Sequence, residues 1–339
     1  MGFKKLGKGG KQMQLFIENN KKLYFPSVLD GVKWTTERKG SPGVLSFSVI
    51  KDEALVFTEG NSISFQYDDE KVFYGFVFSK KRTKDNVIEV TAYDQLRYLK
   101  NKDTYTYENK KASEVIKMLA ADFKLQVGAI EDTQYVIPSR DEDNQTLFDI
   151  INTALTLTTT AKGLLYTMYD DYGKITLKSM ENMTLDILIC NESGEDFDYS
   201  SSIDTNTYNR IKIVYNSESL GNREIFVDQS GENINKWGVL QYYESISGDA
   251  NSDIEKIRAS SKKKAATLLN FYNTKSRSLS FKNLFGDTRV RAGTRVYVNM
   301  NLGDIVLKDY MLVNRVTHTY NKDSHFMDLD LLGGGIYGQ

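Results

Sequence analysis

The first 94 residues alternate between hydrophobic and polar positions with the two-residue period of strands that bury one face. The alternation is clearest at 44–50, and Val72–Phe78 is apolar on both faces apart from Gly75, which predicts a buried strand or an interface. The pattern predicts strands at 14–18, 23–25, 32–38, 44–50, 63–67, 72–78 and 87–93. Short consecutive strands separated by turn residues are typical of a barrel or a sandwich.

The period then changes to that of amphipathic helices. Hydrophobic residues at 112, 115, 116, 119, 120 and 123 predict one helix, with Asn109 as its cap. Those at 147, 150, 151, 154 and 155 predict a second helix that ends before Gly163. A hairpin of strands 164–168 and 174–178 follows around the turn 170–173. These elements predict a small α/β unit inside a β-rich chain.

Strand patterns return at 208–215 and 224–227, and one helix interrupts them before the final strands. Ser252 and Glu255 form a capping box, in which each side chain bonds the other residue's backbone N–H, at the start of an amphipathic pattern that reaches Tyr272. A strand at 290–300 and a hairpin at 310–332 are predicted to complete a second β unit.

Both histidines of the chain lie in this last hairpin. A turn at 321–324 pairs Tyr320 with His325 and His318 with Met327, so both imidazoles share one mostly apolar face. Two histidines so close suggest a metal site, but zinc needs three or four ligands and this face offers no carboxylate or thiol. We therefore predict no metal here and interpret the histidines as packed side chains of a closing hairpin.

Composition and charge exclude several classes of protein. The 339 residues carry 44 basic and 45 acidic side chains, so no overall field attracts nucleic acid or an anionic membrane. One cysteine excludes an intrachain disulfide. No secretory signal opens the sequence, and no apolar run reaches the roughly 18 residues of a membrane span, so we expect a soluble protein made in the cytoplasm. The 21 tyrosines and 17 phenylalanines favour strands and large interfaces.

The sequence gives no positive sign of catalysis. It contains neither a P-loop nor a nucleophile elbow. Carboxylates cluster at 141–143 and 170–171, but both clusters lie in polar, turn-like segments where solvated loop residues are the commoner outcome. A glycosidase needs two carboxylates that face each other across a cleft. We predict no enzymatic activity and no cofactor.

Several segments share their order with one known family. They read TAYDQLRYLKNKDTY at 91–105, ASEVI at 112–116, NR at 209–210, WGVLQ at 237–241, RAGTRV at 291–296, VTHTY at 316–320 and HFMDL at 325–329. Together they resemble the baseplate hub proteins of contractile phage tails, above all the branch found in defective, PBSX-type prophage particles. Each motif alone is only moderately specific, so their common order over most of the chain carries the resemblance.

The resemblance implies a mainly β fold with α+β insertions. It implies two tube-like β-barrel domains at 1–103 and 186–339, a small α/β domain at 104–185, and a helical insertion at about 229–275 within the second barrel region. Such hubs form homotrimers whose six barrels make a ring, so that a three-fold object joins a hexameric tail tube to a trimeric central spike. Closed rings use heterologous contacts, so the two sides of each barrel need different surfaces.

The partners that the resemblance implies are other tail proteins. They are the tail tube protein or tube initiator above the hub, the central spike protein below it and the baseplate wedge proteins around it, in a phage or an R-type-bacteriocin-like particle. We expect assembly into the tail particle after synthesis in the bacterial cytoplasm, with no membrane and no specific nucleic acid as partner. Two other functions stay open: a cell-wall-degrading hydrolase of the tail tip, and a carbohydrate-binding β module.

Seven aromatic residues are candidates for the contacts of such a hub. Those on the two-faced strand are predicted to pack between subunits, and they are Phe73, Tyr74, Phe76 and Phe78. Those predicted to touch the spike or the tube are Trp237, Tyr242 and Tyr243. For each of the seven, an ordinary place in the core of the chain is the alternative.

Overall fold

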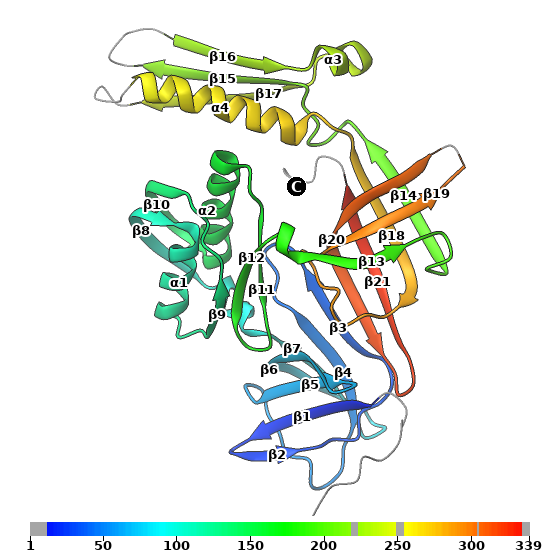
Figure 1. Ribbon diagram of the computed structural model, residues 1–339. Coiled ribbons are helices and arrows are strands. Elements are labelled where there is room, and N and C mark those ends of the chain that lie inside the picture. Colours follow the sequence, from blue (N-terminus) through cyan, green and yellow to red (C-terminus); the bar gives the residue numbers. More distant parts are fainter. Residues whose placement is uncertain (1–11, 218–222, 249–253, 304, 334–339) are drawn as a thin grey trace, which may run out of the picture.

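The computed structural model describes residues 12–217, 223–248, 254–303 and 305–333, and most of its strands form one large sheet (Figure 1). In chain order the strands of this sheet are β1 (Met13–Asn19), β2 (Lys22–Tyr24), β3 (Val32–Glu37), β4 (Val44–Ile50), β5 (Ser62–Tyr67), β6 (Glu70–Arg82), β7 (Val87–Tyr93), β13 (Thr184–Ile189), β14 (Asp196–Ser202), β18 (Ser276–Phe285), β19 (Arg295–Asn301), β20 (Val306–Tyr320) and β21 (His325–Gly333). The hydrogen-bonded path runs β14-β18-β21-β20-β3-β4-β7-β6-β5-β1-β2, and β19 pairs with both β20 and β13.

Strand β20 joins the N-terminal and C-terminal halves of this sheet. Along one edge it pairs with β21 from Leu312 to Tyr320. Along its other edge it pairs first with β19, up to Leu312, and then with β3, from Arg315 to Tyr320. The two β halves are therefore connected by main-chain hydrogen bonds as well as by side chains.

Each half has its own hydrophobic core. The first core is built by β1 and β3–β7 and also takes in Tyr320 from the far end of β20. The second is built by β13 and β18–β21, around Leu279, Phe281 and Val313. The strand pattern read from the sequence alternates as predicted, because Leu45, Phe47 and Val49 are buried while the residues between them are partly exposed. The tip of the C-terminal hairpin thus completes the core of the N-terminal half.

The chain is mainly β, as predicted, and no closed barrel is detected among the described residues. Their sheet path has two ends, β14 and β2, and its halves are continuous through β20 and β3. The two-barrel arrangement therefore remains part of the proposal below.

Between the two halves in chain order lies a small α/β unit with a core of its own. Its elements are the 3-10 helix η1 (Gln95–Lys100), β8 (Lys102–Lys111), α1 (Ala112–Asp122), β9 (Val127–Ile130), β10 (Val136–Thr146), α2 (Leu147–Lys162), β11 (Tyr166–Asp170), β12 (Ile175–Ser179) and the 3-10 helix η2 (Glu181–Met183). Helix α2 begins at the Thr146 cap, whose hydroxyl accepts from the Asp149 N–H, and ends at Gly163 in the left-handed region. Asn109 is not the cap of α1, since it lies within β8 and the helix begins after Lys111.

The second half carries an insertion made of a three-stranded sheet and two helices. These are β15 (Arg210–Ser217), β16 (Arg223–Gln229), α3 (Gly231–Trp237), β17 (Gln241–Gly248) and α4 (Ile254–Tyr272). The strand order is β16-β15-β17, with β15 and β17 parallel. Helix α4 covers one face of this sheet and also contacts α2 of the middle unit. The predicted capping box at 252–255 begins outside the described residues.

The final hairpin has the predicted register, with Tyr320 opposite His325 and His318 opposite Met327.

The sequence pattern did not predict strands whose exposed faces are strongly polar, above all the antiparallel pair β8 and β10. It also missed β9, β13, β14, β17 and β18, and it began the strand that precedes β20 at residue 290, although β19 begins at Arg295. None of the described helices is long and apolar enough to cross a membrane.

Candidate functional site: a joint between the three units

The two histidines form one buried hydrogen-bonded pair. Nδ1 of His318 lies 2.9 Å from Nε2 of His325, and Nε2 of His318 lies 2.8 Å from the carbonyl oxygen of Val290. That carbonyl can only accept, so Nε2–H of His318 donates to it and Nδ1 accepts from Nε2–H of His325. Trp34 stacks on His318 with ring centroids 5.1 Å apart. Burial lowers the pKa of His318 to about 4, so the imidazole stays neutral at physiological pH.

The hydrogen bonds of the pair occupy both ring nitrogens of His318, which a metal ion would also need. Within the described ranges, no group of three or more histidine, cysteine, aspartate or glutamate side chains is placed to hold a metal ion. The pair is a packing and hydrogen-bonding element, and it fixes the end of the β20–β21 hairpin inside the first core.

A second buried polar group lies where all three units meet. Asp94, directly after β7, accepts hydrogen bonds from the backbone N–H groups of Gly43 at 2.7 Å and Leu96 at 3.0 Å. Asp170, the last residue of β11, accepts from the side chain of Gln95 at 3.0 Å. Burial raises the pKa of Asp170 to about 6. Burial also raises the pKa of Asp94 well above its usual range, and the neighbouring charge of Asp170 adds to that rise.

Arg291 from the second β half reaches into the same place. Its Nη1 donates to the backbone oxygen of Asp170 at 3.0 Å. Its guanidinium lies 4.5 Å from the ring centre of Tyr169 and 5.5 Å from that of Trp34. The cavity between these groups measures about 20 Å³, which is room for one water and far too little for a sugar ring. The carboxyl pair therefore lies at a joint where the first β half, the middle unit and the second β half meet.

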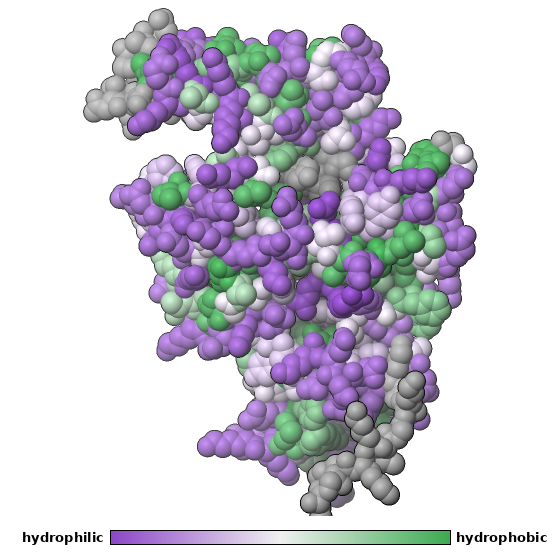
Figure 2. Space-filling view, viewed as in Figure 1, coloured by the Kyte–Doolittle hydropathy of each residue, from purple (hydrophilic) through white to green (hydrophobic). Residues whose placement is uncertain are grey.

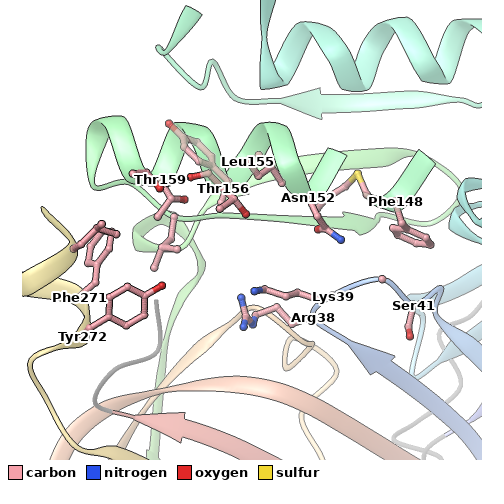
Figure 3. Close-up of a pocket in the computed structure, with 16 residues that line it drawn as sticks. Arg38, Lys39, Ser41, Phe148, Asn152, Leu155, Thr156, Thr159, Phe271 and Tyr272 are labelled. Atoms are coloured by element: carbon pink, nitrogen blue, oxygen red, sulfur yellow. Dashed lines mark hydrogen bonds between the residues drawn. The ribbon is translucent and has the colours of Figure 1, made fainter. Parts of the chain in front are cut away.

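A larger cavity of about 100 Å³ lies at a second meeting point of the units (Figure 3). Arg38 and Lys39, from the turn after β3, extend beneath helix α2 toward Tyr272 at the end of α4. Burial, together with the charge of Arg38, lowers the pKa of Lys39 to about 8. The backbone N–H of Arg38 donates to the oxygen of Asn314 on β20 at 3.0 Å. The cavity is lined by the first β half, the middle unit and the insertion, and its floor carries the two cations Arg38 and Lys39.

The prediction that both carboxylate clusters are solvated is wrong for two members. Glu142 is buried, and Nε of Arg140 donates to it at 2.8 Å, because the alternation of β10 turns this residue toward the core. Asp170 is partly buried because it ends β11 at the joint. Asp141 and Asp143 are exposed, as predicted.

The aromatic residues predicted for subunit packing lie on β6 and contact other parts of the same chain. Phe73 is buried in the first core, with 3% of its surface exposed. The ring centroid of Tyr74 is 5.8 Å from that of Tyr172, between β11 and β12, while Phe76 and Phe78 pack on η1. The apolar outer face of β6 is thus used largely to hold the middle unit. A subunit contact for its exposed parts stays a prediction.

The residues predicted for spike or tube contact lie in the insertion and differ from one another. Trp237, the last residue of α3, is partly buried. Tyr242 faces α4, where its ring stacks on Tyr272 at 5.8 Å, and its hydroxyl donates to Glu244 at 3.2 Å. Tyr243 points to the opposite face of the sheet and is 54% exposed. Of the three, Tyr243 is the most open to a partner.

Sequence reasoning did not single out Asp94 or Arg291 as site residues. Both lie in motifs that carried the resemblance, TAYDQL and RAGTRV. A carboxylate directly after an apolar strand, and an arginine between turn residues, are the available signals. Neither signal says that the two segments meet in space, because they are separated by almost 200 residues of chain.

Known proteins share both the sequence pattern and this fold. The YQBQ-like family model matches residues 32–332. The phage-like element PBSX protein XkdQ of Bacillus subtilis (strain 168) is 29% identical over 279 residues, which cover 81% of this chain and 82% of the relative.

Among solved structures, the tail protein from Neisseria meningitidis MC58 superposes with a TM-score of 0.66 at 13% identity, over 97% of this chain and 98% of that one. The c3393 protein of E. coli is described as a type VI secretion system component similar in structure to the T4 bacteriophage tail proteins gp27 and gp5. It superposes with a TM-score of 0.55 at 10% identity, over 94% of this chain and 76% of that one. The family model covers most of the chain, including Asp94, Arg291 and both histidines, and this protein belongs to the YQBQ-like family.

Proposed function

We propose that this protein is the structural baseplate hub of a contractile tail, a homotrimeric adaptor between the hexameric tail tube and the trimeric central spike. One observation carries the proposal: the fold agrees over nearly the whole chain with that of the tail protein from Neisseria meningitidis MC58. Agreement over a single domain would leave the architecture open, whereas agreement across all units includes their relative arrangement. The PBSX relative supports the same kind of particle.

The geometry suits an adaptor. Two β halves of one chain offer two related but non-identical surfaces, so three chains offer six positions around an axis. Regular spacing of the six needs a fixed angle between the halves of each chain. The β20–β3 ladder and the Asp94–Arg291 joint supply rigid connections of that kind.

The partners in this proposal are the tube protein or tube initiator on one side, the spike on the other and the wedge proteins around the rim. The free end of the first β half has exposed apolar side chains suited to such contacts. Figure 2 shows hydrophobic residues gathered over β1 and β2, where Leu23 is 50% and Phe25 is 70% exposed. These side chains are one proposed contact of the protein within the tail particle.

Two measurements test the proposal together. Light scattering of the purified chain should give a mass three times that of one chain, and deletion of the gene in a producing strain should stop assembly of complete tails. Complementation with the wild-type gene is the control. A chain that stays strictly monomeric at high concentration and in tail preparations would overturn the proposal.

A further inference from the structure

The small sheet of the insertion has two faces of opposite character. On the face that α4 covers, Ile211 and Ile213 pack against the helix. Two acidic side chains of this face pair with α4: Glu224 pairs with Arg258, and Glu244 pairs with Lys264. This face is complete within one chain.

The opposite face, which we call the basic face, has exposed side chains on its two edge strands, β16 and β17. The register aligns residues of the three strands on it, and its described members are Arg210, Lys212, Val214, Asn216, Arg223, Ile225, Val227, Gln229, Gln241, Tyr243 and Ser245. Three of these are cations, and none of the described residues on this face is acidic. Its centre is apolar: Val214 is enclosed by its neighbours, while Ile225 and Tyr243 are each 54% exposed.

One cation of the basic face, Arg210, has a buried side-chain nitrogen, Nε, without a hydrogen-bond partner among the described residues. An apolar centre beside arginine and lysine is typical of a protein interface, whereas a nucleic-acid site gains most from cations alone. The face therefore fits a protein surface that brings carboxylates.

The same chain carries such a surface on β8 and β10, which we call the acidic face. The register places Glu108 opposite Ser139, Thr106 opposite Asp141, and Asp143 close to Thr104. All six side chains are exposed, and the lysines on this side of β8 stand only at its two ends, Lys102 and Lys110. Carboxylates at alternate positions along a strand are roughly 7 Å apart, and so are Arg210 and Lys212.

We propose that the basic face of one subunit docks on the acidic face of a second copy of this chain. The two faces lie on different units and point away from the helices that cover their other sides, so a single chain does not bring them together (Figure 1). Contact between two different surfaces is heterologous, the kind that closes a ring. This inference rests on the proposed trimer and assigns one of its contacts, so Tyr243 meets a neighbouring subunit and not the spike or tube.

Charge reversal tests the contact on the full chain. Lys212→Glu with Arg223→Glu makes the basic face acidic, and Asp141→Lys with Asp143→Lys makes the acidic face basic. Each double variant should raise the dissociation constant of the trimer by roughly a hundredfold, because like charges then face each other. The quadruple variant restores opposite charges in every contact of the ring and should return the trimer to nearly wild-type stability. Lys262→Glu with Lys263→Glu, on exposed positions of α4, is the matched control and should change nothing.

Sedimentation velocity at several protein and salt concentrations gives the readout, and circular dichroism checks folding. Added salt should weaken the wild-type trimer as well, which tests the contact without any variant. A trimer that neither salt nor any double variant weakens overturns this inference and leaves the proposed function intact. Variants that stay trimeric but no longer enter tails would also overturn it, since the basic face would then belong to another tail protein. A wild-type chain that never forms trimers would overturn the proposed function itself.

Discussion

Nδ1 of His318 and Nε2 of His325 lie 2.9 Å apart inside a core that belongs mainly to the other end of the chain. The hairpin that holds them is C-terminal, whereas Trp34, which stacks on His318, comes from the N-terminal half. The hydrogen bond between the two histidines therefore lies where the two halves of the chain pack together.

Replacement of His318 by alanine should destabilise the protein by about 3 kcal/mol. The change leaves a cavity beside Trp34 and removes the partners of the Val290 oxygen and of the His325 N–H. Urea unfolding measures the loss. Thr319→Ala, on the partly exposed opposite face of β20, is the control and should cost less than about 1 kcal/mol.

Stability should depend on pH through His318. Its pKa falls from 6.5 to about 4 on folding because burial penalises the charged form. The unfolded chain then binds the proton more readily, so this residue's contribution is lost as the pH falls from 6.5 toward 4, by about 3 kcal/mol in total.

The carboxyl group of Asp170 has the opposite effect. Its pKa rises from 3.8 to about 6 on folding, so its contribution to stability is present in acid and is lost as the pH rises through 6.

A comparison of the wild type with His318→Asn separates the effect of His318 from that of Asp170, because only the histidine differs between the two proteins. The stability gap between wild type and this variant should shrink by about 2–3 kcal/mol from pH 7 to pH 4.5. A constant gap would contradict the assignment.

Gly286→Ala should disturb the histidine pair without touching either histidine. A Cβ at this position would lie 2.3 Å from ring carbons of His325, so the ring has to shift from the position in which it bonds His318. We expect a loss of about 2 kcal/mol or more in thermal or urea unfolding. Gly231→Ala, where a Cβ meets nothing within 4 Å, is the matched control and should be close to neutral.

Arg291→Ala should loosen the middle unit more than it lowers global stability. The guanidinium lies near Tyr169 and Trp34 and donates to Asp170, so its loss removes a tie between the units. Hydrogen exchange at 166–179 should become faster. Arg289→Ala provides the comparison, since Arg289 and its partner Asp186 are exposed and its partner Asp287 is partly buried. Exchange at 166–179 should be unchanged in that variant. Equal effects of the two variants would argue against a joint at Arg291.

Cell-wall zymography tests the hydrolase alternative directly. The carboxyl pair at the joint is enclosed around a cavity of about 20 Å³, so we expect no zone of clearing from the wild-type protein. A zone that disappears in Asp94→Asn would contradict this view and favour the enzyme.

Local patterns predicted much of the fold, because strand alternation and helix periodicity depend on neighbours in sequence. The register of the final hairpin followed from Asn321–Ser324 and the shared face of His318 and His325. Parallel pairs such as β15–β17 were not predictable in this way, since their partners are distant in the chain. Polar strands such as β8 and β10 hid the alternation, because one of their faces is filled with threonine and carboxylates. The joint could not be foreseen, since Asp94 and Arg291 meet only in the folded chain.

The most direct test of the hub is electron cryomicroscopy of the assembled tail, reconstructed without imposed symmetry. The account predicts three copies of this chain around the axis where the six-fold tube ends, each contributing two β halves to a ring of six positions. Six copies in that ring, or copies found only at the periphery of the baseplate, would contradict it.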